Sequence, residues 1–345
     1  MGLSIMLPFL INQARIHNTS GEFIFERARE CGIEPYLMQA IADGRITAQD
    51  LGLDDLDTRL KAFKATQTAR LMLWNKSLKD ALKVLDMPAI LLKGAPLSER
   101  LTGSALWRES TDIDLWVAPD KWESAVQKLK EIGYWVSDTP HLWATNQILL
   151  SHTSRTSVEI HWELAPPPWK MPTFERARKD AQTYDFQGIP LLLLSDGMQY
   201  LHLLVHAHQH YFALKSVIDF ELAQNRIVPD ANLITEYGLN RLESTLKLIC
   251  NALSTNITSH DIMQTCMHLW YDNLLSSAQR GTLVFGRDSK RDAALGVLLR
   301  AMSMALLNGY SYPIKASLNV IFAGPHCIGR FNVKHLSKRL KKFKI

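Results

Sequence analysis

Hydrophobic residues recur with a helical period in the first quarter of the chain and again in its C-terminal half. In a helix of 3.6 residues per turn, apolar residues spaced three or four apart lie on one face. Over residues 56–85 such a face is formed by Leu60, Phe63, Ala65, Leu71, Leu73, Leu78, Ala81 and Leu82. The pattern predicts a helical N-terminal region over residues 1–85 and a helical C-terminal domain over residues 196–345.

The middle of the chain instead carries short apolar runs bounded by proline and glycine, which is typical of strands. We expect strands over residues 89–92, 112–117, 134–136, 147–151 and 156–162, and helices over residues 96–101 and 119–132. The proline triplet at 166–168 ends the last strand, and an irregular connection is expected from there to about residue 191. Residues 86–195 are therefore expected to form a small mixed sheet within an α+β protein.

An aspartate pair, Asp112 and Asp114, alternates with the apolar Ile113 and Leu115. Side chains two residues apart on a strand share a face at a spacing of about 6–7 Å, so the two carboxylates point the same way. Like charges side by side repel, and a structural strand has little reason to hold them. A divalent cation supplies a reason, because Mg²⁺ prefers oxygen ligands and cancels their charge.

A third carboxylate, Glu159, is expected on a neighbouring strand, on the polar face that it shares with His161. Two metal ions about 3.5–4 Å apart can hold a triphosphate and activate an attacking hydroxyl, and they need oxygen ligands aimed into one cleft. We therefore expect Asp112, Asp114 and Glu159 to be catalytic and to bind two Mg²⁺ ions, with Mn²⁺ as an alternative. Glu159 would also orient or deprotonate the acceptor hydroxyl. A solvated edge-strand position is the alternative for Glu159.

Phosphate contacts are expected upstream of the aspartates. Gly94 lacks a side chain, so a phosphate can approach the backbone N–H groups of the turn before the next helix. Lys93 and Arg108 are candidate phosphate contacts, or alternatively surface charges or structural ion pairs. For His161, packing beside the metal site is favoured over metal ligation.

Histidines cluster over residues 200–212, where His202, His206 and His210 recur every four residues and so lie on one helix face. Such spacing can bind zinc, but no H-E-x-x-H motif is present. The favoured interpretation is a helix beside the cleft whose histidines contact phosphate, base or backbone.

Composition narrows the class of protein. The formal charge of +5, from 39 basic and 34 acidic residues, is too small to favour nucleic acid as a partner. Four scattered cysteines without a C-x-x-C pair fit the reducing cytoplasm and argue against a cysteine zinc site. No apolar run approaches the roughly 18 residues of a transmembrane helix. The basic C-terminal tail is expected to be a solvated face, with an acidic partner, RNA or an anionic membrane as alternatives.

Three motifs together resemble a known family: Lys93-Gly94, the R-x-x-x-D-I-D-L of residues 108–115 and the V-E-I-H-W of residues 158–162. They are similar to the uncharacterised bacterial branch of the nucleotidyltransferase superfamily that includes DNA polymerase β, over roughly residues 85–220. Gly94 is followed by Ala95 here, where the superfamily pattern usually has Gly-Ser or Gly-Gly, and the gap to Asp112 is longer. The resemblance implies a nucleotidyltransferase-type sheet, NTP as substrate, and His206 and Asp219 as further site residues.

The expected function is therefore metal-dependent transfer of a nucleoside monophosphate from NTP to a hydroxyl or phosphate of a small molecule, saccharide or peptide, with release of pyrophosphate. One alternative is a glycosyltransferase whose D-x-D motif holds a nucleotide sugar. That fold usually places a βαβ region before the D-x-D motif, whereas about 85 mostly helical residues and one strand precede it here. The other alternative is a non-catalytic binding or regulatory module, against which the three carboxylates argue.

Overall fold

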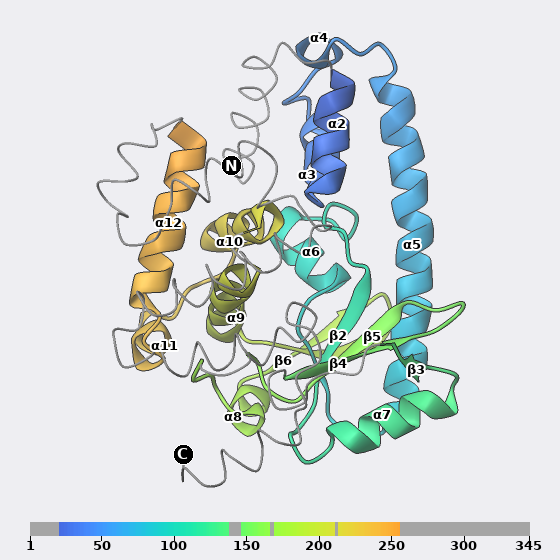
Figure 1. The fold of residues 1–345 in the computed structure, drawn as a ribbon, viewed down its shortest axis with the longest axis vertical. Coiled ribbons are helices and arrows are strands. Elements are labelled where there is room, and N and C mark those ends of the chain that lie inside the picture. The colour runs from blue at the N-terminus through green and yellow to red at the C-terminus, as the bar shows by residue number, and fades with distance from the viewer. Residues whose placement is uncertain (1–20, 138–145, 166–168, 211–212, 256–345) are drawn as a thin grey trace, which may run out of the picture.

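The computed structural model describes residues 21–137, 146–165, 169–210 and 213–255. It shows helices packed around a seven-stranded mixed sheet, which confirms the predicted α+β class (Figure 1). None of the helices in these ranges is long and apolar enough to cross a membrane. The proline triplet, the basic tail and most of the predicted C-terminal helical domain lie outside the described residues.

The N-terminal part is helical, as predicted, and consists of α2 (Gly21–Glu30), α3 (Glu34–Ala42), α4 (Ala48–Leu51) and α5 (Leu56–Leu85). Helix α5 extends from the other N-terminal helices to the sheet (Figure 1). Its sheet-facing side carries Trp74, Leu78, Ala81 and Leu85, spaced four, three and four residues apart. The predicted stripe was wrong at Ala65 and Leu73, which are exposed, and it missed Trp74, which is buried.

The sheet has the strand order β3-β4-β5-β2-β1-β7-β6. The strands are β1 (Ile90–Leu91), β2 (Asp112–Trp116), β3 (Trp135–Val136), β4 (Gln147–Ser151), β5 (Ser157–His161), β6 (Gln182–Phe186) and β7 (Ile189–Leu193). Strand β1 pairs antiparallel with β2 and parallel with β7, and β2 pairs parallel with β5. The first five strands lie within one or two residues of their predicted positions.

The irregular connection predicted up to residue 191 was wrong. This segment contains α8 (Phe174–Lys179) and the hairpin of β6 and β7. The hairpin turns at Gln187 and Gly188, both at positive φ, which is the two-residue turn that matches the twist of the strands. The Gln-Gly pair and Pro190 are not typical of a strand, so the sequence did not predict β7. The strand forms because it pairs with β1.

Each face of the sheet packs against a different set of helices. Alternate strand residues such as Leu91, Leu115 and Ile160 share a core with α5 and α7 (Trp122–Glu131). On the opposite face, Ile90, Leu92 and Trp116 pack against α8 and the start of α9 (Asp196–Gln209). This second face also carries the carboxylates, so helices on that side determine what surrounds them.

A third core joins helices from both halves of the chain. It contains α2, α3 and the first turns of α5, together with α6 (Ala95–Thr102), α9, α10 (Leu214–Arg226) and α12 (Asn240–Thr255). The short α11 (Ala231–Glu236) connects the last two helices. The N-terminal helices are therefore packed against the helices that follow the sheet, and both border the carboxylate-bearing face.

Candidate functional site

Parallel pairing of β2 with β5 brings two of the predicted carboxylates together. Asp114 lies directly opposite Glu159, and Asp112 lies opposite Ser157. Paired strands are about 4.8 Å apart, and opposed side chains on one face are close neighbours. Asp112 therefore stands one strand repeat along from the Asp114–Glu159 pair.

Asp114 is buried, and its carboxylate is neutralised by two cations. Its Oδ1 atom lies 3.0 Å from Lys93 Nζ and 3.2 Å from His161 Nε2. Burial by itself raises the pKa of a carboxyl group, but here Lys93 and His161 outweigh burial and lower the pKa of Asp114. Asp114 is therefore ionised and available as an anionic ligand.

Glu159 is held in place from two sides. Gln147 donates from Nε2 to Glu159 Oε1 over 2.5 Å, and Glu159 Oε2 lies 3.3 Å from His161 Nε2. The sequence analysis did not single out Gln147. The alternation of residues along β4 could have identified Gln147. It places Gln147 and Leu149 on the face opposite the buried Ile148 and Leu150.

Asp112 experiences the repulsion that its spacing predicts. Burial and the neighbouring Asp114 carboxylate raise the pKa of Asp112 to about 6. A divalent cation beside the two side chains would remove this repulsion. The raised pKa marks a position where a cation is favourable.

The donors near Asp114 suit a divalent metal ion. Ligand atoms of Asp114, Glu159 and His161 all lie within 4.8 Å of one another. His161 is buried, and although burial opposes its charge, hydrogen bonds to Asp114 and Glu159 raise its pKa to about 9. Asp112 is not part of this close set, and its predicted role as a metal ligand stays a prediction.

Lys93 links the aspartate site to the histidine-rich helix. Its Nζ atom lies 3.2 Å from His206 Nε2 as well as next to Asp114. Burial opposes the charge on Lys93, but the carboxylates of Asp114, Asp112 and Glu159 outweigh it and raise the Lys93 pKa. Burial and the Lys93 charge together lower the pKa of His206 well below its usual range, so His206 is neutral and accepts from Lys93.

The predicted histidine face exists on α9. The rings of His202 and His206 are 5.7 Å apart between centroids, and those of His206 and His210 are 4.2 Å apart. Burial and the charge of Lys93 lower the pKa of His202 to about 3. His202 and His206 are therefore neutral beside Lys93, and contact of the histidines with phosphate or base stays a prediction.

Of the two roles expected for Arg108, the structure shows the structural ion pair. Arg108 Nε lies 3.0 Å from both carboxylate oxygens of Asp219, and Nη2 lies 2.9 Å from Oδ2. The Tyr36 hydroxyl also donates to Asp219. The network is fully buried and connects α3, α10 and the segment before β2. A phosphate contact by Arg108 stays a prediction, as does a direct ligand role for Asp219.

Gly94 is required by packing at the start of α6. It has φ of 101°, and a Cβ atom there would lie 2.4 Å from Trp74 Cζ2. The Trp74 indole in turn donates from Nε1 to the backbone oxygen of Asp112 over 2.9 Å. Trp74 therefore sits between the glycine turn and the aspartate strand, a role that the sequence analysis missed because an aromatic residue on a helix face normally indicates core packing.

Replacing Gly94 with alanine is expected to lower the free energy of unfolding by about 2–4 kcal/mol, since the added methyl overlaps the Trp74 ring and the left-handed backbone disfavours a side chain. Urea unfolding followed by tryptophan fluorescence measures this. Gly103→Ala is the matched control, because Gly103 also has positive φ, at 84°, but has open space around its Cβ position. Equal destabilisation by both changes would contradict the packing role.

Lys215 on α10 is a further cation beside the site that sequence analysis missed. It donates from Nζ to the backbone oxygen of Glu109 over 2.8 Å. Burial and the neighbouring Arg108 lower its pKa to about 8, against the opposing charges of Asp219, Glu109 and Asp112. A single lysine in a helical pattern carries no sequence signal for such a position.

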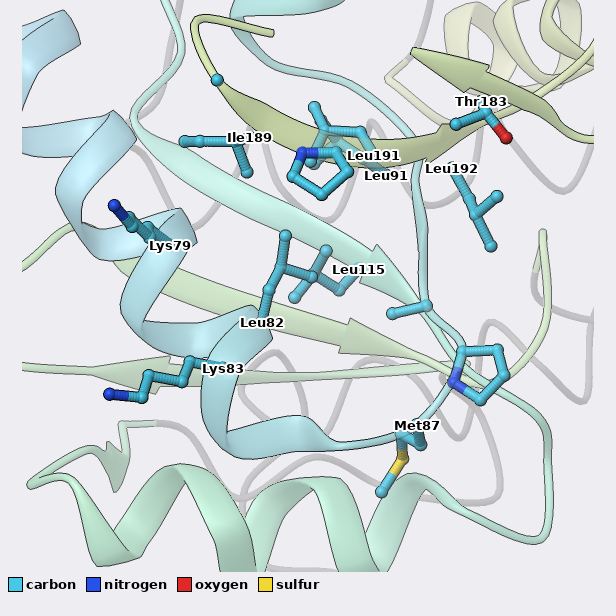
Figure 2. A pocket seen from close by; sticks show the side chains of 14 residues that line it. Lys79, Leu82, Lys83, Met87, Leu91, Leu115, Thr183, Ile189, Leu191 and Leu192 are labelled. Carbon is cyan, nitrogen blue, oxygen red and sulfur yellow. The ribbon is translucent and has the colours of Figure 1, made fainter. Parts of the chain in front are cut away.

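A cavity of about 500 Å³ lies on the other face of the sheet (Figure 2). Its lining is mostly apolar and includes Leu82 of α5, Leu91 of β1 and Leu115 of β2. Leu115 follows Asp114 on its strand, so it points to the opposite side of the sheet. This cavity is therefore separate from the carboxylates.

Comparisons with known proteins identify the family of this chain. Two solved structures of the antibiotic-resistance factor ANT(2'')-Ia are similar at 13% sequence identity: a solution structure that matches over 55% of this chain and 97% of that protein with a TM-score of 0.35, and a crystal structure in complex with adenylyl-2''-tobramycin that matches over 51% and 95% with a TM-score of 0.32. No curated protein matches the chain. The model of a family described as uncharacterised nucleotidyltransferase matches residues 20–244. This match covers more than half of the chain, which therefore belongs to that family and is a nucleotidyltransferase.

Proposed function

We propose that this enzyme transfers a nucleoside monophosphate from NTP to a hydroxyl or phosphate group of a small molecule, saccharide or peptide, in a reaction that depends on Mg²⁺ or Mn²⁺. The observation that carries the proposal is the register of β2 and β5. It places Asp114 opposite Glu159 and Asp112 one repeat away, all on one face of the sheet. A nucleotidyltransferase needs such a set of oxygen ligands in one place.

Bound metal ions would supply Lewis-acid activation of the α-phosphate and charge neutralisation for the leaving pyrophosphate. Asp112, Asp114 and Glu159 are the residues proposed to hold them. Donor atoms of Asp114 and Glu159 already lie within coordination reach of a common point, which fits a divalent ion. Asp114 is buried and Glu159 is only partly exposed, so both carboxylates lie largely out of bulk solvent.

The side chains around the carboxylates have separate proposed roles. Glu159, which Gln147 holds through Oε1, orients or deprotonates the acceptor hydroxyl. The acceptor oxygen then bonds to the α-phosphorus, and the bond from that phosphorus to the bridging oxygen of pyrophosphate breaks. Lys93, whose raised pKa keeps it charged, stabilises the negative charge on the phosphates.

Different regions of the chain have different proposed roles. Residues 86–195 carry the carboxylates, and the helices after them contribute His206 and Asp219 to the surroundings of the site. Scattered cysteines without a close pair suit a cytoplasmic location. The family match favours nucleotide transfer over the glycosyltransferase and the non-catalytic module.

The test is to incubate the protein with Mg²⁺ or Mn²⁺, each α-labelled NTP in turn and a panel of sugar, aminoglycoside, phosphorylated and peptide acceptors. We expect label to move to one acceptor class with stoichiometric release of pyrophosphate, and chelation by EDTA to stop it. A double Asp112→Asn/Asp114→Asn variant should bind NTP weakly and transfer nothing. If the wild type and the double variant bind NTP equally and neither shows turnover, the proposal is wrong. Transfer from a sugar nucleotide without release of pyrophosphate would favour the glycosyltransferase.

A further inference from the structure

His161 occupies the centre of the carboxylate cluster and not its edge. Its Nε2 atom lies 3.2 Å from Asp114 Oδ1 and 3.3 Å from Glu159 Oε2. The imidazole comes from the same strand and the same face as Glu159, two residues further on. One nitrogen and two carboxylate oxygens therefore converge from two adjacent strands.

These separations match the ligands of one metal ion. Ligand atoms bound at about 2.1–2.2 Å and at roughly right angles to one another stand about 3.0–3.1 Å apart. Both measured separations are within about 0.3 Å of that value. An ion between the three atoms would take the place of the proton that His161 Nε2 shares with the two carboxylates.

In the described part of the chain, hydrogen bonds to the two carboxylates orient the His161 ring. The second ring nitrogen, Nδ1, is buried and has no hydrogen-bond partner there. Among the described residues, the ring therefore makes its polar contacts through Nε2, with the two carboxylates.

We infer that His161 is a direct nitrogen ligand of the metal ion held by Asp114 and Glu159, and that this ligand makes the site prefer Mn²⁺ to Mg²⁺. Mg²⁺ takes oxygen ligands almost exclusively, whereas imidazole suits divalent transition metals. The inference rests on the proposed function for the existence of the metal site. It replaces the packing role that the sequence favoured for this histidine.

Electron spin echo spectroscopy of Mn²⁺ bound to the full chain tests this ligand directly. We expect the wild type to show nitrogen modulation, and labelling of histidine with ¹⁵N to change that pattern. His161→Gln should lose the modulation and bind Mn²⁺ at least about tenfold more weakly, while its ratio of Mn²⁺ to Mg²⁺ affinity falls. His152→Gln is the matched control, because His152 packs against Tyr134 in another part of the sheet and should leave the signal intact.

Oxygen-only coordination in the wild type overturns the inference, as does modulation that survives His161→Gln. The wild-type spectrum with labelled histidine decides the question even where the variant fails to fold. Absence of Mn²⁺ binding also overturns it. Nucleotide transfer measured with Mg²⁺ keeps the two claims separate: turnover with oxygen-only coordination removes the histidine ligand alone, and a nitrogen-bound ion without turnover removes the proposed function alone.

Discussion

Replacement of Asp114 with asparagine is expected to reduce nucleotidyl transfer by about 10³-fold or more. Asp114 is the buried carboxylate that faces Glu159 and holds Lys93 and His161 on one oxygen. Metal-assisted activation supplies several kcal/mol to such reactions, and about 4 kcal/mol corresponds to about 10³ in rate. Initial rates of pyrophosphate release under saturating Mg²⁺ measure the loss.

The matched control for Asp114→Asn is Asp120→Asn. Asp120 follows the same strand, but its side chain is 72% exposed and forms an ion pair with the neighbouring Lys121, so its neutralisation should leave the rate unchanged. Glu159→Gln is a second variant at the site, in a less buried position, and should also lose activity. Circular dichroism and thermal unfolding separate loss of chemistry from loss of fold. Transfer at more than about a tenth of the wild-type rate in folded Asp114→Asn protein would contradict the catalytic role.

Replacement of Asp219 with alanine is expected to lower the free energy of unfolding by about 3–5 kcal/mol, because the Arg108 guanidinium would remain buried without its carboxylate. Burial opposes ionisation of Asp219, but the charge of Arg108 and its hydrogen bonds lower the Asp219 pKa. The Tyr36 hydroxyl would lose its acceptor as well. Urea unfolding monitored by circular dichroism gives the change.

Two controls distinguish a buried charge effect from general damage. Glu236→Ala removes a similar arginine partner from the exposed Arg176, and it should cost at most about 1 kcal/mol. The double variant Arg108→Met/Asp219→Leu removes both charges, and it should be more stable than Asp219→Ala because no buried charge is left unpaired. A double variant less stable than the single one would show that shape, and not charge, dominates at this position.

The Arg108–Asp219 pair also explains how the helical regions reach the site. Tyr36 comes from the N-terminal helices and Asp219 from the helices after the sheet, while Arg108 leads directly into the strand of Asp112. The family resemblance predicted Asp219 as a site residue. In the structure, Asp219 binds Arg108 and Tyr36, so it stabilises the segment that leads to the aspartates. Stability and catalysis are therefore expected to be coupled through the segment that precedes β2.

Local pattern alone was sufficient for the strands that carry the carboxylates. Asp112 and Asp114 alternate with Ile113 and Leu115, and Glu159 alternates with Val158 and Ile160. This alternation predicted which face of each strand packs into the core, because apolar side chains favour burial and charged side chains favour a polar surface. The same reasoning predicted the long helix before the sheet and the histidine face of α9.

Only the tertiary structure decided which distant residues meet. Strands β2 and β5 lie next to each other in parallel because a helix and two further strands intervene along the chain, and this topology is what places Glu159 against Asp114. The β6–β7 hairpin exists because β7 pairs with β1, although its own residues signal a turn poorly. Local periodicity reports only which side of an element is buried, whereas strand pairing depends on the free energy of the whole fold.

The same distinction applies to charge. The sequence by itself determined the kinds of side chain present near the aspartates, and the resemblance in its motifs indicated nucleotide transfer. It did not determine that Arg108 pairs with Asp219 or that Lys93 contacts His206, because the members of each pair are more than a hundred residues apart in the chain. A buried charge acquires its partner only once the chain has packed, so its role as ligand, counter-charge or support is decided by the tertiary structure.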